Sequence, residues 1–208
     1  MRIDDIAELY AERGHRVYEG EGITQLEHAW QCGRLARRAG AAPALQLASW
    51  LHDLGHLMTG LHGSPTLRGI DDAHEHAAAG VLVQLFGPKV SEPVALHVLA
   101  KRCLAATQPG YRERLSPDSV RSLVLQGGPM RADEAAAFLE KRGAGDALRL
   151  RAWDDAAKDR TLKSADTGQM IEELRLVVRE AASFAGAAGV QRGPGSCAAK
   201  SPSSKARL

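Results

Sequence analysis

Helix-forming signals run through almost the whole chain, and they restrict it to an all-α fold. Alternating patterns rich in Val, Ile and Thr, typical of strands, are missing, whereas Ala, Leu, Arg and Glu dominate. Thr24 and Glu27 form a capping box that begins a helix ending before Gly40. Pro43 suits the first turn of a second helix, which we expect Gly55 to end. We predict a helical bundle with helices at about residues 24–39, 43–54, 72–86, 88–105, 117–126, 131–141, 146–160 and 168–184.

Two segments are expected to lie outside these helices. Residues 56–71 hold three glycines and a proline, so we predict a long loop there. Residues 187–208 are rich in Gly, Pro, Ser and Ala and carry four basic residues and no acid. Because the formal charge of the whole chain is +2, the remainder has a charge near −2. We predict one folded domain over residues 1–186 and a disordered basic tail over residues 187–208.

The composition excludes several classes of protein. Hydrophobic residues make up 44% of the chain and charged residues 25%, a balance typical of a folded soluble domain. No apolar run reaches the ~18 residues that a membrane helix needs, and the N-terminus lacks the apolar core of a signal peptide. The three cysteines form no CxxC pair, which favours a reducing compartment. Aromatic residues are only 4% and the body has no basic stripe, so we predict a cytoplasmic protein that binds neither membranes nor nucleic acid.

Polar side chains on apolar helix faces are the most informative positions. Residues three, four or seven apart on a helix share a face. By that rule, four histidines and two aspartates fall on inward faces, where an unpaired polar group is costly. His74 is preferred over His76 because apolar residues such as Ala78 share its side of the helix, whereas His76 points about 200° away. The inward residues are His28, His52, Asp53, His74, His97 and Asp154.

These residues together predict a two-metal centre. Any one of them alone is explained more simply as a hydrogen-bonded core or surface residue than as a metal ligand. That explanation does not account well for all six together. Imidazole nitrogens and carboxylate oxygens are ligands for iron, manganese, zinc or nickel, and a single tetrahedral zinc site needs only three or four of them. In the adjacent pair His52–Asp53, the histidine would bind one ion and the aspartate would be shared with a second. The HExxH, GxSxG, P-loop and GxGxxG motifs are absent from the sequence.

The order in which His28, His52–Asp53 and Asp154 occur resembles the H…HD…D pattern of the HD-domain superfamily, helical metalloproteins most of which are phosphohydrolases. Longer stretches resemble, more specifically, the HD-domain oxygenases of phosphonate-degradation operons, and this likeness covers about residues 5–165. The stretches are TQLEHAWQCG (24–33), WLHDLGH (50–56), HE (74–75), LHVLAKR (96–102), YRERLSPDSVRSLVLQGGPM (111–130) and LRAWDDAAK (150–158).

The resemblance implies a mixed-valent Fe(II)/Fe(III) pair that uses O2 to break the carbon–phosphorus bond of a 1-hydroxyphosphonate and release phosphate. The implied substrate is 2-amino-1-hydroxyethylphosphonate or an N-methylated analogue. The inward residues listed above would be the iron ligands, with Asp53 bridging, and His56 would lie near the substrate-binding iron. Tyr18 and Glu21 match a pair that occupies the open iron position until substrate displaces it. Phosphonate binding is implied for Lys101, Ser119, Ser122 and Arg151.

The residue types themselves also favour an anion site. Ser119, Ser122 and Gln126 lie at positions i, i+3 and i+7 and therefore share one helix face. Lys101 and Arg151 add positive charge beside the proposed metal ligands. Hydroxyls, an amide and cations suit the oxygens of a dianionic phosphonate through charge-assisted hydrogen bonds. The alternative for the two cations is an ordinary ion pair or a solvated face.

Two other functions fit much of the same pattern. A metal-dependent phosphohydrolase acting on a small phosphorylated metabolite would use the same ligands, so only the redox chemistry of the metal separates it from an oxygenase. A non-catalytic binding protein with a degenerate site would lack ligands, and none is missing here. We therefore predict a diiron dioxygenase, with the phosphohydrolase as the alternative.

Overall fold

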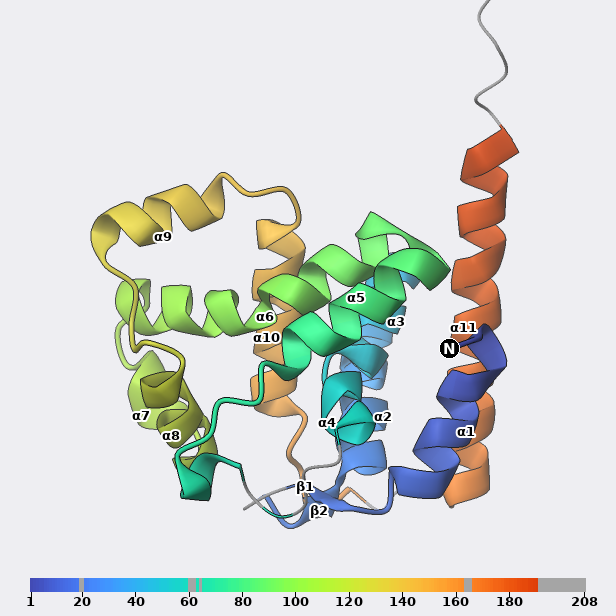
Figure 1. Ribbon diagram of the computed structural model, residues 1–208, viewed down its shortest axis with the longest axis horizontal. Coiled ribbons are helices and arrows are strands. Elements are labelled where there is room, and N and C mark those ends of the chain that lie inside the picture. The colour runs from blue at the N-terminus through green and yellow to red at the C-terminus, as the bar shows by residue number, and fades with distance from the viewer. Residues whose placement is uncertain (19–20, 60–62, 64, 163–165, 191–208) are drawn as a thin grey trace, which may run out of the picture.

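The computed structural model describes residues 1–18, 21–59, 63, 65–162 and 166–190, with side chains as far as residue 183. Helices form nearly all of its regular structure (Figure 1), so the predicted all-α class is confirmed. The exception is one short antiparallel hairpin of β1 (Val17–Tyr18) and β2 (Ile23–Thr24). The helices are α1 (Ile3–Arg13), α2 (Gln25–Arg38), α3 (Pro43–Leu51), α4 (Leu54–Met58), the 3-10 helix η1 (Thr66–Arg68), α5 (His74–Phe86), α6 (Pro88–Thr107), α7 (Tyr111–Arg114), α8 (Pro117–Leu125), α9 (Ala132–Leu139), α10 (Ala144–Ala156) and α11 (Thr167–Val190).

A bundle of packed helices forms the core. α6 packs against α3, α5 and α10, and α2 packs against α3 and α10. Their apolar faces bury Trp30, Trp50, Leu82 and Leu150 in one cluster. α11 packs against α1 and α3 on one side of this bundle, and α9 lies on the far side with a second apolar cluster that contains Phe138 (Figure 1). None of the described helices combines the length and apolar character needed to cross a membrane.

The predicted capping box at the start of α2 is confirmed. Thr24 Oγ1 accepts a hydrogen bond from the Glu27 backbone N–H at 3.1 Å, and Glu27 Oε2 accepts one from the Thr24 backbone N–H at 2.7 Å. The hairpin that precedes α2 is not predicted from the sequence. It pairs Val17 with Thr24 and Tyr18 with Ile23. Strands of this length are too short to show the alternation by which strands are recognised.

The predicted helix over residues 43–54 is wrong at its C-terminal end. α3 stops at Leu51, and the separate helix α4 follows it. Gly55 does not end a helix but lies inside α4, against the backbone of α5. A Cβ atom added at Gly55 would lie 2.1 Å from the His74 carbonyl oxygen. The glycine therefore marks a close approach of two helices rather than a helix end. The loop predicted over residues 56–71 is correspondingly interrupted by α4 and η1.

Gly55→Ala is expected to lower the free energy of unfolding by about 2 kcal/mol or more, because the new methyl group overpacks a backbone contact that cannot easily yield. Thermal unfolding of metal-free protein measures this change. Gly80→Ala in α5 is the matched control: its added Cβ meets no described atom within 4 Å, so the variant should be as stable as the wild type or slightly more so. Equal losses at both positions would contradict the close-approach argument.

The remaining predicted helices are confirmed, with shifted ends. α5 begins at His74 rather than at residue 72, because Ala73 has a left-handed backbone with φ 48° that a helix cannot contain. α6 continues through Pro93 to Thr107, and α11 continues to Val190. α1 and α7 are not predicted from the sequence. Residues 191–208 lie outside the described residues, so the division into a domain and a disordered tail stays a prediction.

Candidate metal centre

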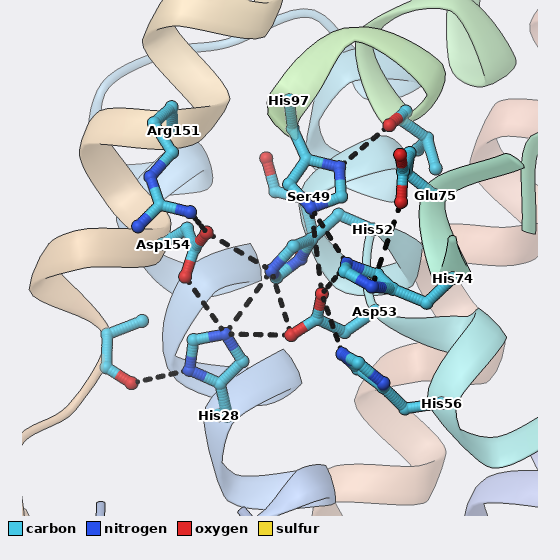
Figure 2. Close-up of polar contacts among 12 residues, drawn as sticks. His28, Ser49, His52, Asp53, His56, His74, Glu75, His97, Arg151 and Asp154 are labelled. Atoms are coloured by element: carbon cyan, nitrogen blue, oxygen red, sulfur yellow. Dashed lines mark hydrogen bonds and ion pairs between the residues drawn. The ribbon is translucent and has the colours of Figure 1, made fainter. Parts of the chain in front are cut away.

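The predicted metal ligands meet inside the bundle, although they come from widely separated parts of the chain (Figure 2). Each has no more than 7% of its surface exposed. The predicted orientation of the α5 histidines is also confirmed, since His74 is buried and the His76 side chain is 74% exposed. The predicted ligands are His28 from α2, His52 and Asp53 from the turn after α3, His74 from α5, His97 from α6 and Asp154 from α10.

One half of the centre is formed by His28, His52, Asp53 and Asp154. The Nε2 atoms of His28 and His52 are 3.2 Å apart. His28 Nε2 lies 3.4 Å from Asp154 Oδ1 and 3.6 Å from Asp53 Oδ2, and His52 Nε2 lies 3.4 Å from Asp53 Oδ2. Ligand atoms that surround one ion at 2.0–2.2 Å are about 2.8–3.6 Å from their neighbours. These separations therefore match the edges of one coordination shell.

The other half is formed by Asp53, His74 and His97, with His56 at its edge. His74 Nε2 lies 3.2 Å from His97 Nε2 and 3.3 Å from Asp53 Oδ1. His97 Nε2 and His56 Nε2 lie 3.8 Å and 3.9 Å from the same oxygen. Asp53 thus turns one carboxylate oxygen toward each half, as a bridging ligand does. Among the described residues, two triads have ligand atoms that all lie within 4.8 Å of one another, His28–His52–Asp53 and Asp53–His56–His74, so His56 is a further candidate ligand.

The orientation of the imidazole rings suits metal ions between them. Nδ1 of His28, His52 and His97 each lies 2.7–2.9 Å from a backbone carbonyl oxygen. Because a carbonyl oxygen only accepts, each Nδ1 carries a proton, and Nε2 is the ring atom that faces the centre and would bind a metal ion. Within the described part of the chain, Asp53 Oδ2 and Asp154 Oδ1 also lack a hydrogen bond. Facing imidazole nitrogens and unbonded carboxylate oxygens in a buried site are the donor set that fits metal ions.

The ionisation of the cluster agrees with this fit. Burial disfavours the charged form of His74, but hydrogen bonds to Asp53 and Asp72 raise its pKa to about 10. Burial likewise opposes ionisation of Asp53, yet the neighbouring His52 holds the pKa of that carboxyl well below its usual range. Burial and the nearby histidines push the pKa of His97 well below its usual value. In the metal-free cluster, protons on His52 and His74 therefore balance the ionised carboxylates, and bound metal ions would replace these protons.

Asp72 is a residue of this site that the sequence analysis missed. Its Oδ1 accepts a hydrogen bond from His74 Nδ1 at 2.9 Å, and its Oδ2 accepts one from His56 Nδ1 at 2.7 Å. The rings of His56 and His74 stack with centroids 3.9 Å apart. Left-handed Ala73 turns the chain between Asp72 and His74, so that the two side chains meet. The sequence does show an aspartate two residues before the first histidine of a helix. This spacing indicates a contact between the two side chains only once the turn at Ala73 is known.

Asp72→Asn is expected to weaken metal binding about tenfold, the lower end of the effect of removing a residue that orients ligands. The amide offers one acceptor oxygen where two N–H groups need one each, so either His56 or His74 loses its orientation. Anaerobic titration of metal-free protein with Fe(II) measures the affinity. Asp4→Asn, at an exposed position of α1, is the control and should bind as the wild type does. Unchanged affinity in Asp72→Asn would argue against an orienting role.

A cavity of about 480 Å³ opens onto one half of the centre. Its wall includes His56, His74 and His97. The imidazoles of His28 and His52 are fully buried and do not reach the described wall. A molecule in the cavity therefore meets the histidines of one half, His74 and His97, whereas the other half reaches the wall only through its carboxylates.

A second part of the cavity wall carries the residues predicted to bind an anion. Ser119, Ser122 and Gln126 line it from α8 and its C-terminal end, as their shared face predicts. Lys101 Nζ donates a hydrogen bond to Ser122 Oγ at 2.7 Å. Burial, together with the charge of Arg151, lowers the pKa of Lys101 to about 7. No carboxylate of the described residues forms an ion pair with Lys101, so an anion in the cavity would be its counter-ion.

Arg151 lies in the same wall but is held by acids of the protein itself. Its Nη1 lies 2.7 Å from Asp154 Oδ2, its Nε donates to the Tyr111 hydroxyl at 3.1 Å, and its Nη2 pairs with Asp155. Arg151 thus supports the carboxylate that faces His28. The phosphonate-binding role that the resemblance implies for Arg151 stays a prediction.

Tyr18 and Glu21 occupy different parts of the cavity wall. Tyr18 stacks on the ring of His28 with centroids 4.0 Å apart, and burial with the charge of Asp53 raises its pKa well above the usual value. Glu21 Oε1 instead accepts a charged hydrogen bond from Lys158 Nζ at 2.8 Å. Lys158 is a second lining residue that the sequence analysis did not assign to the site. That Tyr18 and Glu21 occupy an open metal position stays a prediction.

Comparisons with known proteins identify the family, although no family model matches the chain. The chain is 39% identical over 174 residues to the hydroxymethylphosphonate dioxygenase of Gimesia maris, across 83% of this chain and 86% of the relative. It is 36% identical over 165 residues to the 1-hydroxy-2-(trimethylamino)ethylphosphonate dioxygenase (glycine-betaine-forming) of Leisingera caerulea, across 79% of this chain and 84% of the relative. Similarity of this extent to both enzymes means that the chain belongs to the phosphonate dioxygenase family.

Proposed function

We propose that the protein is an HD-type diiron oxygenase that uses O2 to cleave the carbon–phosphorus bond of a 1-hydroxyphosphonate and releases phosphate. The observation that carries the proposal is the position of the cavity. It joins one half of a two-metal donor set to a wall of hydroxyls and a buried ammonium group without a carboxylate partner among the described residues. The substrate is a small organophosphonate, and we propose a cytoplasmic location and no nucleic-acid or membrane partner.

The donor set suits a pair of iron ions in a mixed-valent Fe(II)/Fe(III) state. The ligands are imidazole nitrogens and carboxylate oxygens without sulfur, which is the set that non-haem iron uses. His28, His52 and Asp154 would hold one ion, His74 and His97 the other, and Asp53 would bridge them. Bound iron would supply Lewis-acid and redox chemistry toward O2 and the substrate hydroxyl.

The other residues of the cavity bind and orient the substrate. Lys101, Ser119 and Ser122 would hold the phosphonate oxygens through charge-assisted hydrogen bonds. Gln126 adds a buried amide oxygen that lacks a hydrogen bond among the described residues, and it would accept one from the substrate. The bound phosphonate then places the adjacent carbon and its hydroxyl toward His74 and His97, which share the same cavity.

The test is a parallel assay of O2 uptake and phosphate release by iron-loaded protein. Substrates are 2-amino-1-hydroxyethylphosphonate, its N-methylated analogues and hydroxymethylphosphonate, and metal analysis with EPR spectroscopy follows the iron before and after addition. We expect equal amounts of O2 consumed and phosphate released with at least one of them. Phosphate release from phosphomonoesters without O2 uptake, driven by manganese or nickel, would replace this proposal by the phosphohydrolase alternative.

A further inference from the structure

Lys158 lies between an acidic side chain and the serines of the anion-binding wall. Its Nζ is 2.8 Å from Glu21 Oε1, 3.1 Å from Ser119 Oγ and 3.2 Å from Ser116 Oγ. The side chains of Lys158 and Glu21 are 13% and 9% exposed, so their ion pair is largely removed from water. The ammonium group therefore has one charged partner and two hydroxyl partners, and it also lies 5.7 Å from the centre of the Tyr18 ring. Both Lys158 and Glu21 line the cavity.

The two ammonium groups of this wall differ in what an anion would have to displace. Lys101 contacts Ser122 and has no carboxylate partner among the described residues. Lys158 already has a counter-ion, so it turns fully to an anion at Ser119 only by leaving Glu21. A buried carboxylate that loses its cation is strongly destabilised until another positive charge replaces it. When an anion at the serines draws Lys158 away, a second cation beside Glu21 would therefore stabilise the complex.

We propose that Lys158 is a substrate-binding residue that exchanges Glu21 for the phosphonate, and that the released Glu21 favours substrates with a positively charged substituent. This inference rests on the proposed function. With an amino-bearing phosphonate, the pair Lys158–Glu21 is replaced by two pairs, Lys158 with the phosphonate and Glu21 with the ammonium. With an uncharged substituent only the first new pair forms, so Glu21 competes with the phosphonate for Lys158.

The experiment measures binding of two unreactive probes that lack the 1-hydroxyl group, methylphosphonate and 2-aminoethylphosphonate. These probes differ in an ammonium-bearing substituent. Isothermal titration calorimetry gives their dissociation constants for iron-loaded wild type, Lys158→Met and Glu21→Gln under anaerobic conditions. Lys141→Met, at an exposed position, is the control for removing a lysine charge. Turnover of the 1-hydroxyphosphonates is measured in parallel.

The two variants are expected to behave differently. Lys158→Met should weaken both probes about tenfold, because each loses one charged hydrogen bond to the phosphonate. Glu21→Gln should change the binding of the two probes in opposite directions. It frees Lys158, so methylphosphonate should bind several-fold more tightly. It also removes the acceptor for the ammonium group, so 2-aminoethylphosphonate should bind about tenfold more weakly. Lys141→Met should leave both dissociation constants unchanged.

A merely structural ion pair gives another pattern. If Glu21→Gln shifts both probes in the same direction, or if neither variant shifts either probe while the wild type turns over a 1-hydroxyphosphonate, the Lys158 assignment is overturned and the proposed function stands. A wild type that neither binds the probes nor turns over any hydroxyphosphonate overturns the proposed function, and this inference with it.

Discussion

Replacing Asp53 with asparagine is expected to empty both halves of the metal centre and to lower kcat/KM on the order of 1000-fold or more, beyond the 10–100-fold typical of residues that only orient ligands. Among the described residues, Asp53 alone turns one oxygen toward His28 and His52 and the other toward His74. Asparagine preserves the shape of the side chain, but it removes the negative charge and directs N–H groups at the lone pairs of one histidine pair.

Iron analysis and EPR spectroscopy after anaerobic loading measure this effect. Asp154→Asn provides a sharper comparison, because His28 and His52 are the only candidate ligand histidines that Asp154 contacts among the described residues. Its loss should therefore empty mainly the half that contains these two histidines. The exposed variants Asp4→Asn and His76→Gln should load as the wild type does. Full iron content in Asp53→Asn would mean that the carboxylate does not bridge two ions.

The convergence of the candidate ligands could be predicted from the sequence because most of them lie on helices whose apolar face is readable. Helical spacing placed His74 inward and His76 outward, and the structure has that orientation. The convergence of ligands from distant helices followed from the cost of burying each one alone. The spacing of residues along the helices was thus enough to identify the buried polar side chains, without knowledge of how the helices pack.

The residues that escaped prediction lie where helical periodicity gives no direction. Asp72 precedes left-handed Ala73, and Lys158 follows the end of α10. His56 was expected near the centre from the family resemblance alone, and the helix α4 that carries it was not predicted. A glycine needed for close packing has the same sequence signal as one that ends a helix. These side chains receive their direction from turns and contacts between distant segments, which a single sequence does not display.

Lys101→Met is expected to weaken phosphonate binding roughly 100-fold and yet to stabilise the folded protein by about 1–2 kcal/mol. Both effects follow from a buried ammonium group that has no ion pair with the described residues. Methionine has a similar length and no charge to desolvate. Thermal unfolding and calorimetry with methylphosphonate measure the two effects. Lys89→Met, exposed on the same helix, is the control. A destabilised Lys101→Met would show that the ammonium is satisfied without a ligand.

The pKa of Lys101 also fixes how both effects change with pH. Burial lowers this pKa from 10.5 to about 7 in the folded protein. Below about pH 7 the ammonium is charged whether the chain is folded or unfolded, so the full cost of burying it is present. Between about pH 7 and 10.5 only the unfolded chain keeps the proton, so the cost fades as the pH rises. The stability gained by Lys101→Met should therefore be largest near about pH 6 and shrink toward about pH 9.

Phosphonate binding should show the matching trend, because the bound anion needs the charged form of Lys101. Above about pH 7 the free wild-type protein must take up a proton to bind, which lowers its affinity, whereas Lys101→Met has no such requirement. Titration of the phosphonate itself is common to both proteins and cancels in the ratio of their affinities. The affinity of the wild type divided by that of Lys101→Met should fall as the pH rises from about 6 to about 9. A ratio that stays constant over this interval would mean that another group supplies the charge that holds the phosphonate.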